Sequence, residues 1–343
     1  MRSRTDFWSG VVRTTVIAGL LVFANGGPSP VAVAQSAPPP ELTPFRGLID
    51  HVSAAPNGWL PSSSVENWPR SISGDGRFVV MESMSWDLVP NDQNWLADVF
   101  LRDRQTGTTT RLSVGDDGSE GNGMSQLGAI STNGRHVAFA SGSSNLVPGD
   151  TNGNWDVFVR DLDRGRTVRV SVASGGAQTD ADSYWPAISA DGRFVAFLSG
   201  ASTLAPGTVL YQPIQAYLHD RDADGNGAFD EPAGTTTSLV SASSTGGFAD
   251  AHVEAVRVSA DGRFVLFESA ATNLDPTGNP SHYTHVYRRD RQSGQTTVID
   301  RTAVGEPSSN GVYSRTADLS DDGRYVTYVS MFRAGLVELS GPA

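Results

Sequence analysis

The segment SADGRFVAFLS, residues 189–199, decides the fold of this chain, because near copies of it occur five times. Each copy is a Ser-x-Asp/Asn-Gly-Arg turn followed by a run in which apolar residues alternate. The copies begin at Ser73, Ser131, Ser189, Ser259 and Ser320. Their turn glycines are separated by 58, 58, 70 and 61 residues. Self-similarity at such a period is the signature of a repeat array.

Each repeat is predicted to contain four short strands. Residues 187–189 lead into the turn, and residues 193–199 alternate beyond it, which is a hairpin signal. A third strand is expected at 98–103, 156–161 and 285–290, and a Thr-rich fourth strand follows a Gly-containing turn, as at 108–114. Four-stranded units repeated radially predict an all-β fold, a β-propeller of five four-stranded blades. Six blades remain an alternative if the long connections contain a further unit.

The two ends of the repeat array predict how the ring closes. The fifth unit lacks an equivalent of residues 156–161 and ends in GLVELS, residues 335–340. Residues 48–53 (LIDHVS) resemble a fourth strand but precede the first full unit. We expect GLVELS to be the third strand of the last blade and LIDHVS its fourth, so that N- and C-terminal strands close the ring and remove exposed edges. An open or truncated array is the alternative.

The repeat resembles that of a known family. The pattern S-x-D-G-R-[FY]-V-x-[FY], together with NLVPGDTNGNWDVFVRD at residues 145–161, is similar to the TolB-type, WD-like β-propeller repeat of exported bacterial proteins. The resemblance covers residues 48–340 and implies the fold, whereas propellers host many functions. TolB has an α/β domain before its propeller and related peptidases add a hydrolase domain. Nothing here fills the first role, and no G-x-S-x-G motif occurs.

Residues 1–34 are predicted to be a signal peptide. Arg2, Arg4 and Arg13 precede an apolar run at 14–24 that is too short to span a bilayer, and residues 32–34 form an A-x-A cleavage site. A Pro-rich linker at 35–46 and a single propeller domain at 47–343 are expected to follow. The protein is therefore expected in the periplasm, at the cell surface or in the medium, with no integral membrane segment after cleavage. An uncleaved membrane anchor is the alternative.

Composition excludes several kinds of chemistry. The chain has no cysteine, and all 25 basic residues are arginine. Thiol catalysis, lysine Schiff bases and the P-loop lysine are therefore excluded. The net charge of −12 disfavours nucleic acid and anionic lipid as partners. Ordinary solubility explains the same charge equally well.

The strongest local motif is DRDADGNGAFDE, residues 220–231. Calcium prefers six to eight oxygen ligands, and alternating Asp and Asn on a tight turn direct several oxygens to one point. One register matches the EF-hand loop. The other resembles calcium loops in β-hairpins, and we prefer it because both flanks are predicted strands. It makes calcium a structural cofactor, held by the side chains or carbonyls of Asp222, Asp224, Asn226, Ala228 and Asp230. A solvated acidic turn is the alternative.

A weaker relative of this loop lies in the second unit. It offers a possible second metal set, namely Asp150, Asn152, Asn154 and Asp156. The first unit keeps Asp92, Asn94 and Asp98 but has Leu96 at the third position. Because the candidate ligands are not kept in every repeat, an alternative is that Asp and Asn cap the backbone of the loop. A transition-metal site at the loop histidines His252, His282 and His285 is a further alternative to solvated side chains.

Loop lengths predict a binding face. Connections between strands two and three, and between blades, are long and emerge at one end of a propeller, and long loops on a rigid frame are typical recognition sites. They carry the candidate ligand-binding aromatics Trp86, Trp95, Trp155, Tyr184 and Trp185. Packing between blades is the alternative role. The arginines after the turns recur at one position and are expected to pair with acids or carbonyls between blades.

The leading hypothesis is a monomeric, exported, non-catalytic propeller that binds an extracytoplasmic protein or glycan and carries structural calcium. A secreted hydrolase or lyase acting on a glycan or lactone is the competing class. It needs an acid and a base a few ångströms apart. Candidates for such carboxylates near the channel are Asp180, Asp182, Asp250 and Glu254. A scaffold without a dedicated ligand is a third possibility.

Overall fold

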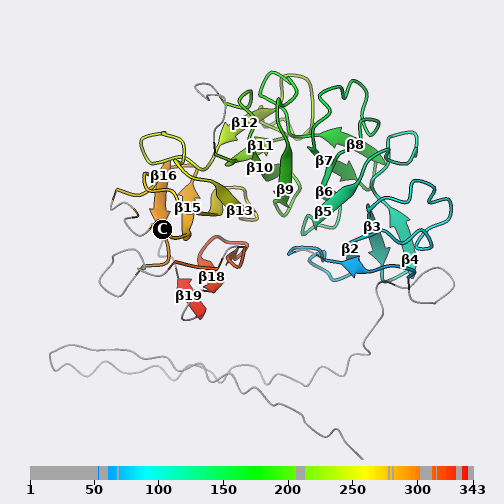
Figure 1. The fold of residues 1–343 in the computed structure, drawn as a ribbon, viewed down its shortest axis with the longest axis horizontal. Helices are drawn as coiled ribbons and strands as arrows, with labels where there is room; N and C mark the ends of the chain where they lie inside the picture. The colour runs from blue at the N-terminus through cyan, green and yellow to red at the C-terminus, as the bar shows by residue number, and fades with distance from the viewer. Residues whose placement is uncertain are drawn as a thin grey trace, which may run out of the picture. The chain divides into compact units, whose positions relative to one another are not determined.

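The computed structural model describes residues 61–67, 69–205, 213–276, 282–301, 311–313, 315–329 and 334–338, with Ser53 and Asn279; of 334–338 it describes the backbone alone. The signal peptide, the linker and all of LIDHVS except Ser53 lie outside these residues. The described chain is all-β and forms five antiparallel sheets, which are the five predicted blades (Figure 1). No helix of the described residues is long and apolar enough to cross a membrane.

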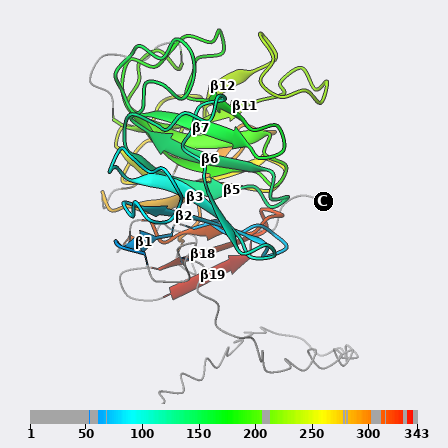
Figure 2. The ribbon, with the colours of Figure 1, turned by 90° about the vertical axis from the view of Figure 1, so that its right-hand side faces the viewer.

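Four blades have four strands each, in meander order. Blade 1 contains β1 Val65–Glu66, β2 Phe78–Ser83, β3 Asp98–Asp103 and β4 Thr108–Arg111. Blade 2 contains β5 Ser125–Ile130, β6 His136–Ser141, β7 Asp156–Asp161 and β8 Arg166–Arg169. Blade 3 contains β9 Ser183–Ile188, β10 Phe194–Ser199, β11 Gln215–Asp220 and β12 Thr236–Leu239. Blade 4 contains β13 Val253–Val258, β14 Phe264–Ser269, β15 His285–Asp290 and β16 Gln295–Val298. Figure 2 shows the strands of blade 2 from the side.

Blade 5 has three described strands, β17 Asp318–Leu319, β18 Tyr325–Val329 and β19 Ala334–Glu338. The prediction for GLVELS is confirmed, since β19 pairs with β18 as the third strand of this sheet. Its predicted fourth strand, LIDHVS, falls outside the described residues. Within the described chain, blades 1 and 5 meet through Arg70, whose Nη2 donates to the carbonyl of Leu319 at 2.8 Å.

The blades pack through the turn that defines the repeat. The second strands of blades 1, 2 and 3 (β2, β6 and β10) lie against the first strand of the next blade. Gly262 has φ +72°, and a Cβ there would lie 2.0 Å from Cδ2 of Phe194 in the preceding blade. The aromatic ring at the start of the second strand of one blade therefore fills the space over the turn glycine of the next blade. His136 takes the same place over Gly192.

Each turn is held by its own side chains. In blade 3, Ser189 Oγ donates to Asp191 Oδ1, and that carboxylate accepts the Arg193 amide. Arg193 then forms a two-point pair with Asp220, with Nε at 2.7 Å and Nη2 at 2.9 Å. Asp220 ends β11 and faces the start of β10 in the same sheet. The expectation that these arginines pair between blades is therefore wrong: antiparallel register places the acid within the blade.

Candidate functional site

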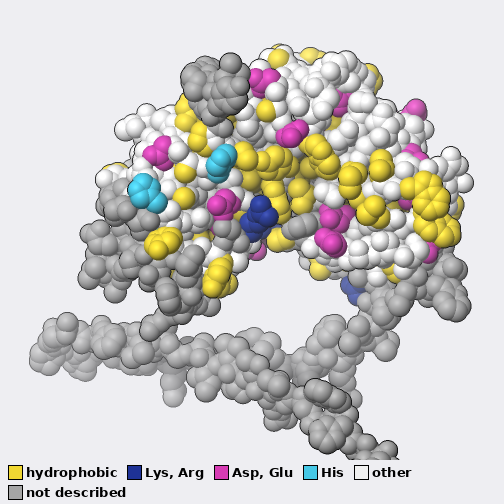
Figure 3. All heavy atoms as spheres, in the orientation of Figure 1, with side chains coloured by type: hydrophobic (Ala, Val, Ile, Leu, Met, Phe, Trp, Pro, Cys, Tyr) yellow, Lys and Arg dark blue, Asp and Glu magenta, His cyan; other side chains and the backbone are white. Residues whose placement is uncertain are grey.

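We call the end of the propeller that carries the connections from strand two to strand three the long-loop end. In blade 1, residues 84–97 form this connection, and they carry three exposed apolar side chains: Met84, Trp86 and Trp95, with exposed fractions of 52%, 51% and 66%. The ring centroids of Trp86 and Trp95 lie 6.1 Å apart. We call these two residues the Trp pair. Figure 3 shows hydrophobic side chains gathered over the inner strands and also at the side of blade 1.

Trp95 holds a backbone conformation that is costly for tryptophan. Its φ is +59°, and Leu96 donates its amide to Asn94 Oδ1 at 2.7 Å beside it. In blade 2 the same place belongs to Gly153, with φ +70°. The two residues correspond because each comes three residues before the aspartate that opens the third strand, Asp98 or Asp156. A non-glycine residue in this region costs about 1–2 kcal/mol, and the exposed ring recovers little of it by burial.

The other predicted aromatics are half-buried. Tyr184 and Trp185 pack against the core between blades 3 and 4. Arg315 stacks over Trp185, with its guanidinium carbon 4.3 Å from the ring centroid. Trp155 lies against Gly142. The structure thus separates the predicted set into the exposed Trp pair and three residues that pack between elements.

The same loop contributes to a cluster of charged side chains, the blade 1 cage, made of Asp92, Asp98, Glu120 and Arg111. One oxygen from each carboxylate lies within 4.8 Å of the others. Arg111 Nη1 lies 3.6 Å from Asp92 Oδ1 and 3.2 Å from Asp98 Oδ2, and it also contacts Glu120 Oε1. Asp98 accepts a second hydrogen bond, 2.5 Å long, from Ser113 Oγ. The cage ties the loop to both outer strands.

The predicted second metal set lies in the equivalent blade 2 cage. Arg169 Nη1 is 2.9 Å from Asp150 Oδ1 and 3.2 Å from Asp156 Oδ2. Asn152 donates to Asp156 Oδ2 at 3.0 Å and accepts the Asn154 amide at 3.1 Å. A guanidinium therefore already places positive charge between the two aspartates. Metal binding by this set stays a prediction that the geometry does not favour.

The third-unit loop connects β11 to β12, so its predicted flanking strands are confirmed. Asn226 Nδ2 donates to Asp224 Oδ2 at 2.9 Å and to Glu231 Oε2 at 2.7 Å. Both oxygens of the buried Asp222 accept the amide of Gly227 at 3.2 Å. Asn226 Oδ1 accepts the amide of Ala228. Asp222, Asp224 and Asn226 thus lie on one turn.

Asp230, the fifth predicted ligand, points elsewhere. Its two oxygens pair with Nε and Nη2 of Arg221, at 2.9 Å and 2.5 Å, and Arg221 is only 2% exposed. Arg221 also lies over the ring of Phe229, which contacts His136 in blade 2. Arg221, Phe229 and Asp230 therefore pack between blades 2 and 3. As placed, Asp230 is a partner of arginine, and the turn around Asp224 is separate from it.

Three of the four carboxylates suggested for catalysis cap neighbouring loops, whereas Glu254 lies half-buried in β13. Asp180 accepts the amide of Ser202 at 2.7 Å, and Asp250 accepts that of Thr272 at 2.7 Å. Asp182 accepts the amide of Trp155 at 2.9 Å. Burial raises the pKa of Asp180, but hydrogen bonds from Ser202 outweigh it and lower the pKa. With a lowered pKa, Asp180 is a poor general acid at neutral pH.

The loop histidines do not gather either. His285 is fully buried, and its Nδ1 lies 2.7 Å from Asp300 Oδ2. His252 Nδ1 accepts the amide of Ile214 at 2.9 Å. In the described part of the chain, His252, His282 and His285 do not form a set of metal-ligating side chains.

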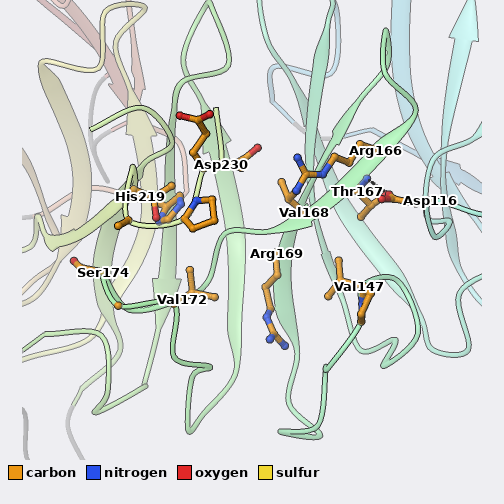
Figure 4. Close-up of a pocket in the computed structure, with 17 residues that line it drawn as sticks. Asp116, Val147, Arg166, Thr167, Val168, Arg169, Val172, Ser174, His219 and Asp230 are labelled. Carbon is orange, nitrogen blue, oxygen red and sulfur yellow. Dashed lines mark hydrogen bonds between the residues drawn. The ribbon is translucent and has the colours of Figure 1, made fainter. Parts of the chain in front are cut away.

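A groove of about 640 Å³ lies between blades 2 and 3. Figure 4 shows His219 and Asp230 on one side of it and Arg166 and Asp116 on the other. His219 Nδ1 lies 2.8 Å from Thr237 Oγ1, and burial lowers the pKa of His219 to about 4. A similar groove of about 730 Å³ separates blades 1 and 2. Similar grooves occur between two pairs of neighbouring blades, and in the first of them His219 and Asp230 are held by Thr237 and Arg221.

Sequence reasoning missed Arg111 and Glu120. Both belong to the blade 1 cage, yet they lie in the fourth strand and in the connection to blade 2. A signal was present: Arg111 and Arg169 occupy the same register position in β4 and β8, opposite Phe100 and Phe158. An arginine repeated beside repeated acids indicates an ion pair.

No protein-family model matches this chain, and no curated protein matches it either. Solved structures match it at low identity. TolB from Acinetobacter baumannii is 17% identical, with a TM-score of 0.44 over 80% of this chain and 51% of that chain. A putative TolB from Agrobacterium tumefaciens is 14% identical, with a TM-score of 0.45, over 79% and 72%. An oligogalacturonate lyase in complex with manganese is 13% identical, with a TM-score of 0.44, over 78% and 64%.

This chain thus spans about half the length of the Acinetobacter TolB. Identities below 25% concern the fold alone, and function must come from the site. The chain is a five-bladed β-propeller whose repeat resembles that of TolB-type propellers.

Proposed function

We propose that this protein is a non-catalytic binding module, exported as a monomer, that recognises an extracytoplasmic glycan or protein through the Trp pair at the long-loop end of blade 1. The strained, exposed conformation of Trp95 is the observation that carries this proposal. Strain of this kind clusters at functional sites and persists when the surroundings impose it. If the residue at position 95 served only to fold the loop, glycine would be more stable there, as Gly153 is in blade 2.

The surroundings of the Trp pair favour a glycan. Asn91 and Gln93 are exposed on the same loop and offer amide donors and acceptors beside the rings. Aromatic faces stack on the apolar faces of sugar rings, while amides bond the hydroxyl groups. A protein ligand would use the same rings as anchors and is the second candidate.

A catalytic role has less support. Asp180, Asp182 and Asp250 are occupied as loop caps, and in the groove between blades 2 and 3 Asp230 is paired with Arg221 and burial favours neutral His219. A glycan or lactone hydrolase needs a free carboxylate pair at a fixed separation. We therefore place recognition, and not bond cleavage, at the long-loop end.

We also propose structural calcium in the third-unit loop, held by Asp222, Asp224 and Asn226. The support is the shared turn on which these oxygens lie and the prediction from their spacing. Thermal unfolding tests it: millimolar calcium should raise the melting temperature relative to a chelator. Asp224→Ala should abolish this rise, and an unchanged rise in that variant would contradict the site.

The binding proposal is tested on a glycan array with the wild-type chain and Trp86→Ala/Trp95→Ala. The control is Ile72→Ala, which removes an equally exposed apolar side chain, 57% exposed, from the other end of blade 1. The wild type and the control should bind a common set of glycans that the double variant loses. Equal binding by the double variant would overturn the assignment to the Trp pair. Capture of one stoichiometric protein instead of glycan would favour the second candidate.

A further inference from the structure

The blade 1 cage carries more negative charge than its arginine neutralises. Asp92, Asp98 and Glu120 supply three carboxylates against the single guanidinium of Arg111. The side chains of Asp92 and Asp98 are 2% and 0% exposed. Buried charge is expensive unless it is paired and hydrogen-bonded. A net charge of two negative units is left in a place that water hardly reaches.

The surroundings of Asp92 show this shortage of positive charge. Its Oδ1 is buried and has no hydrogen-bond partner, although Arg111 lies 3.6 Å away. The atom faces the oxygens of Asp98 and Glu120 across the cage. An orphaned carboxylate oxygen aimed at two others needs a cation or a proton.

The blade 2 cage provides the comparison within the same chain. It has the same two aspartates and the same arginine, but Gln178 stands where blade 1 has Glu120. The match extends to the backbone: Glu120 accepts the Gln93 amide, and Gln178 accepts the Thr151 amide. The two cages therefore differ by one charge at this position, and blade 2 has one further hydrogen bond, from Thr179 Oγ1 to Asp156 Oδ1 at 3.2 Å.

We propose that the blade 1 cage is a binding site for a divalent cation of calcium-like chemistry, with Asp92, Asp98 and Glu120 as ligands and Arg111 displaced from the centre. Hard carboxylate oxygens are the ligands that calcium prefers. A further oxygen lies beside Arg111: the backbone carbonyl of Asn91 accepts a hydrogen bond from Arg111 Nη2 at 3.1 Å. Two positive charges balance the excess that a single guanidinium leaves. The blade 2 cage also has a buried oxygen without a hydrogen-bond partner, Asp150 Oδ1, but with one acid fewer its arginine leaves a single negative charge instead of two.

The test uses terbium as a luminescent calcium substitute with the full-length chain. Trp95 lies between Asn94 and Asp98 in sequence and can sensitise terbium bound in the cage. Calcium should compete the tryptophan-excited emission away. Glu120→Gln, which gives blade 1 the composition of blade 2, should weaken terbium binding about tenfold or more, because affinity follows ligand charge. Asp224→Ala, in the third-unit loop, should leave this signal unchanged.

The reciprocal change is Gln178→Glu, which should create a second sensitised site beside Trp155. A further variant, Arg111→Gln, removes the competing cation: its melting temperature should fall in chelator and recover in calcium. Absence of calcium-competed emission in the wild type would overturn the proposal, and so would full binding by Glu120→Gln. A chelator-induced loss of stability in Arg111→Gln that calcium fails to reverse would show that a proton, and not a metal ion, satisfies Asp92.

Discussion

Trp95 in blade 1 occupies the position that Gly153 occupies in blade 2, and both hold a positive φ. Glycine adopts this conformation freely, whereas tryptophan does so at a cost. The neighbouring hydrogen bonds are the same in both loops: Asn94 Oδ1 accepts the Leu96 amide in one, and Asn152 Oδ1 accepts the Asn154 amide in the other. The exchange therefore adds a large exposed ring to a loop that does not need it to fold.

Trp95→Gly should separate stability from binding. We expect the variant to gain about 1 kcal/mol in free energy of unfolding, because the left-handed conformation is then unstrained. Glycan or protein binding should fall at the same time. Urea unfolding and the array assay measure the two effects. A loss of stability would show that the ring packs in the native state, which would remove the argument from strain.

Gly262→Ala should be far more damaging than its φ alone explains. The added Cβ would meet Phe194 at 2.0 Å, so overpacking adds to the backbone cost, for about 3 kcal/mol in all. Gly118→Ala is the matched control, since φ is +80° there and no atom lies within 4 Å. It should cost only about 1 kcal/mol. Equal losses in denaturant unfolding would contradict the packing role of the repeat glycine.

His136→Phe should remove part of the acid sensitivity of the fold. Burial, with help from Arg221, lowers the pKa of His136 to about 4. Below its ordinary value of 6.5, the unfolded chain binds a proton that the folded chain refuses, so stability falls as pH falls from 6.5 towards 4. This residue should cost roughly 2 kcal/mol at about pH 5.

Phenylalanine fits this position in the sister units, where Phe194 and Phe264 cover the next turn glycine. The variant should therefore match or exceed wild-type stability at neutral pH and lose less on acidification. His219, with a pKa also lowered to about 4, will retain some slope. Unfolding curves at several pH values measure this. Identical pH dependence in both proteins would mean that His136 titrates freely.

Arg221→Gln should destabilise the protein by about 3 kcal/mol or more, because Asp230 would be left without its buried partner. The double variant Arg221→Gln/Asp230→Asn should recover much of the loss, since no charge remains to be paired. A double-mutant cycle by chemical unfolding gives the coupling energy. Additive losses would show that the two residues act independently.

The fold could be predicted because the residues that recur in each repeat are the ones that pack between neighbouring blades. Its Gly, its ring and its alternating strand are the parts that touch between blades, as Phe194 and Gly262 show. The sequence predicted that the repeated arginines pair between blades. Antiparallel register instead brings Asp220 next to Arg193 within blade 3. The ring closure by LIDHVS falls outside the described residues and stays a prediction.

The site was less predictable, because its parts come from different elements. Spacing placed Asp222 and Asp224 on one turn, where their role as metal ligands stays a prediction, but it could not show that Asp230 turns to Arg221. Exposure separated Trp95 from Trp185, although both are tryptophans near the long-loop end. Glu120 joins Asp92 only through the folding of the blade 1 to blade 2 connection.

The most direct test of the binding role is nitrogen-15 NMR of the tryptophan indole groups during titration with soluble oligosaccharides that the array selects. The chain has seven tryptophans, and Trp86→Phe and Trp95→Phe assign the two signals of interest. The account predicts saturable shifts in the signals of Trp86 and Trp95, with the Trp185 signal unmoved. Binding that shifts Trp185 and leaves the Trp pair unchanged would contradict it.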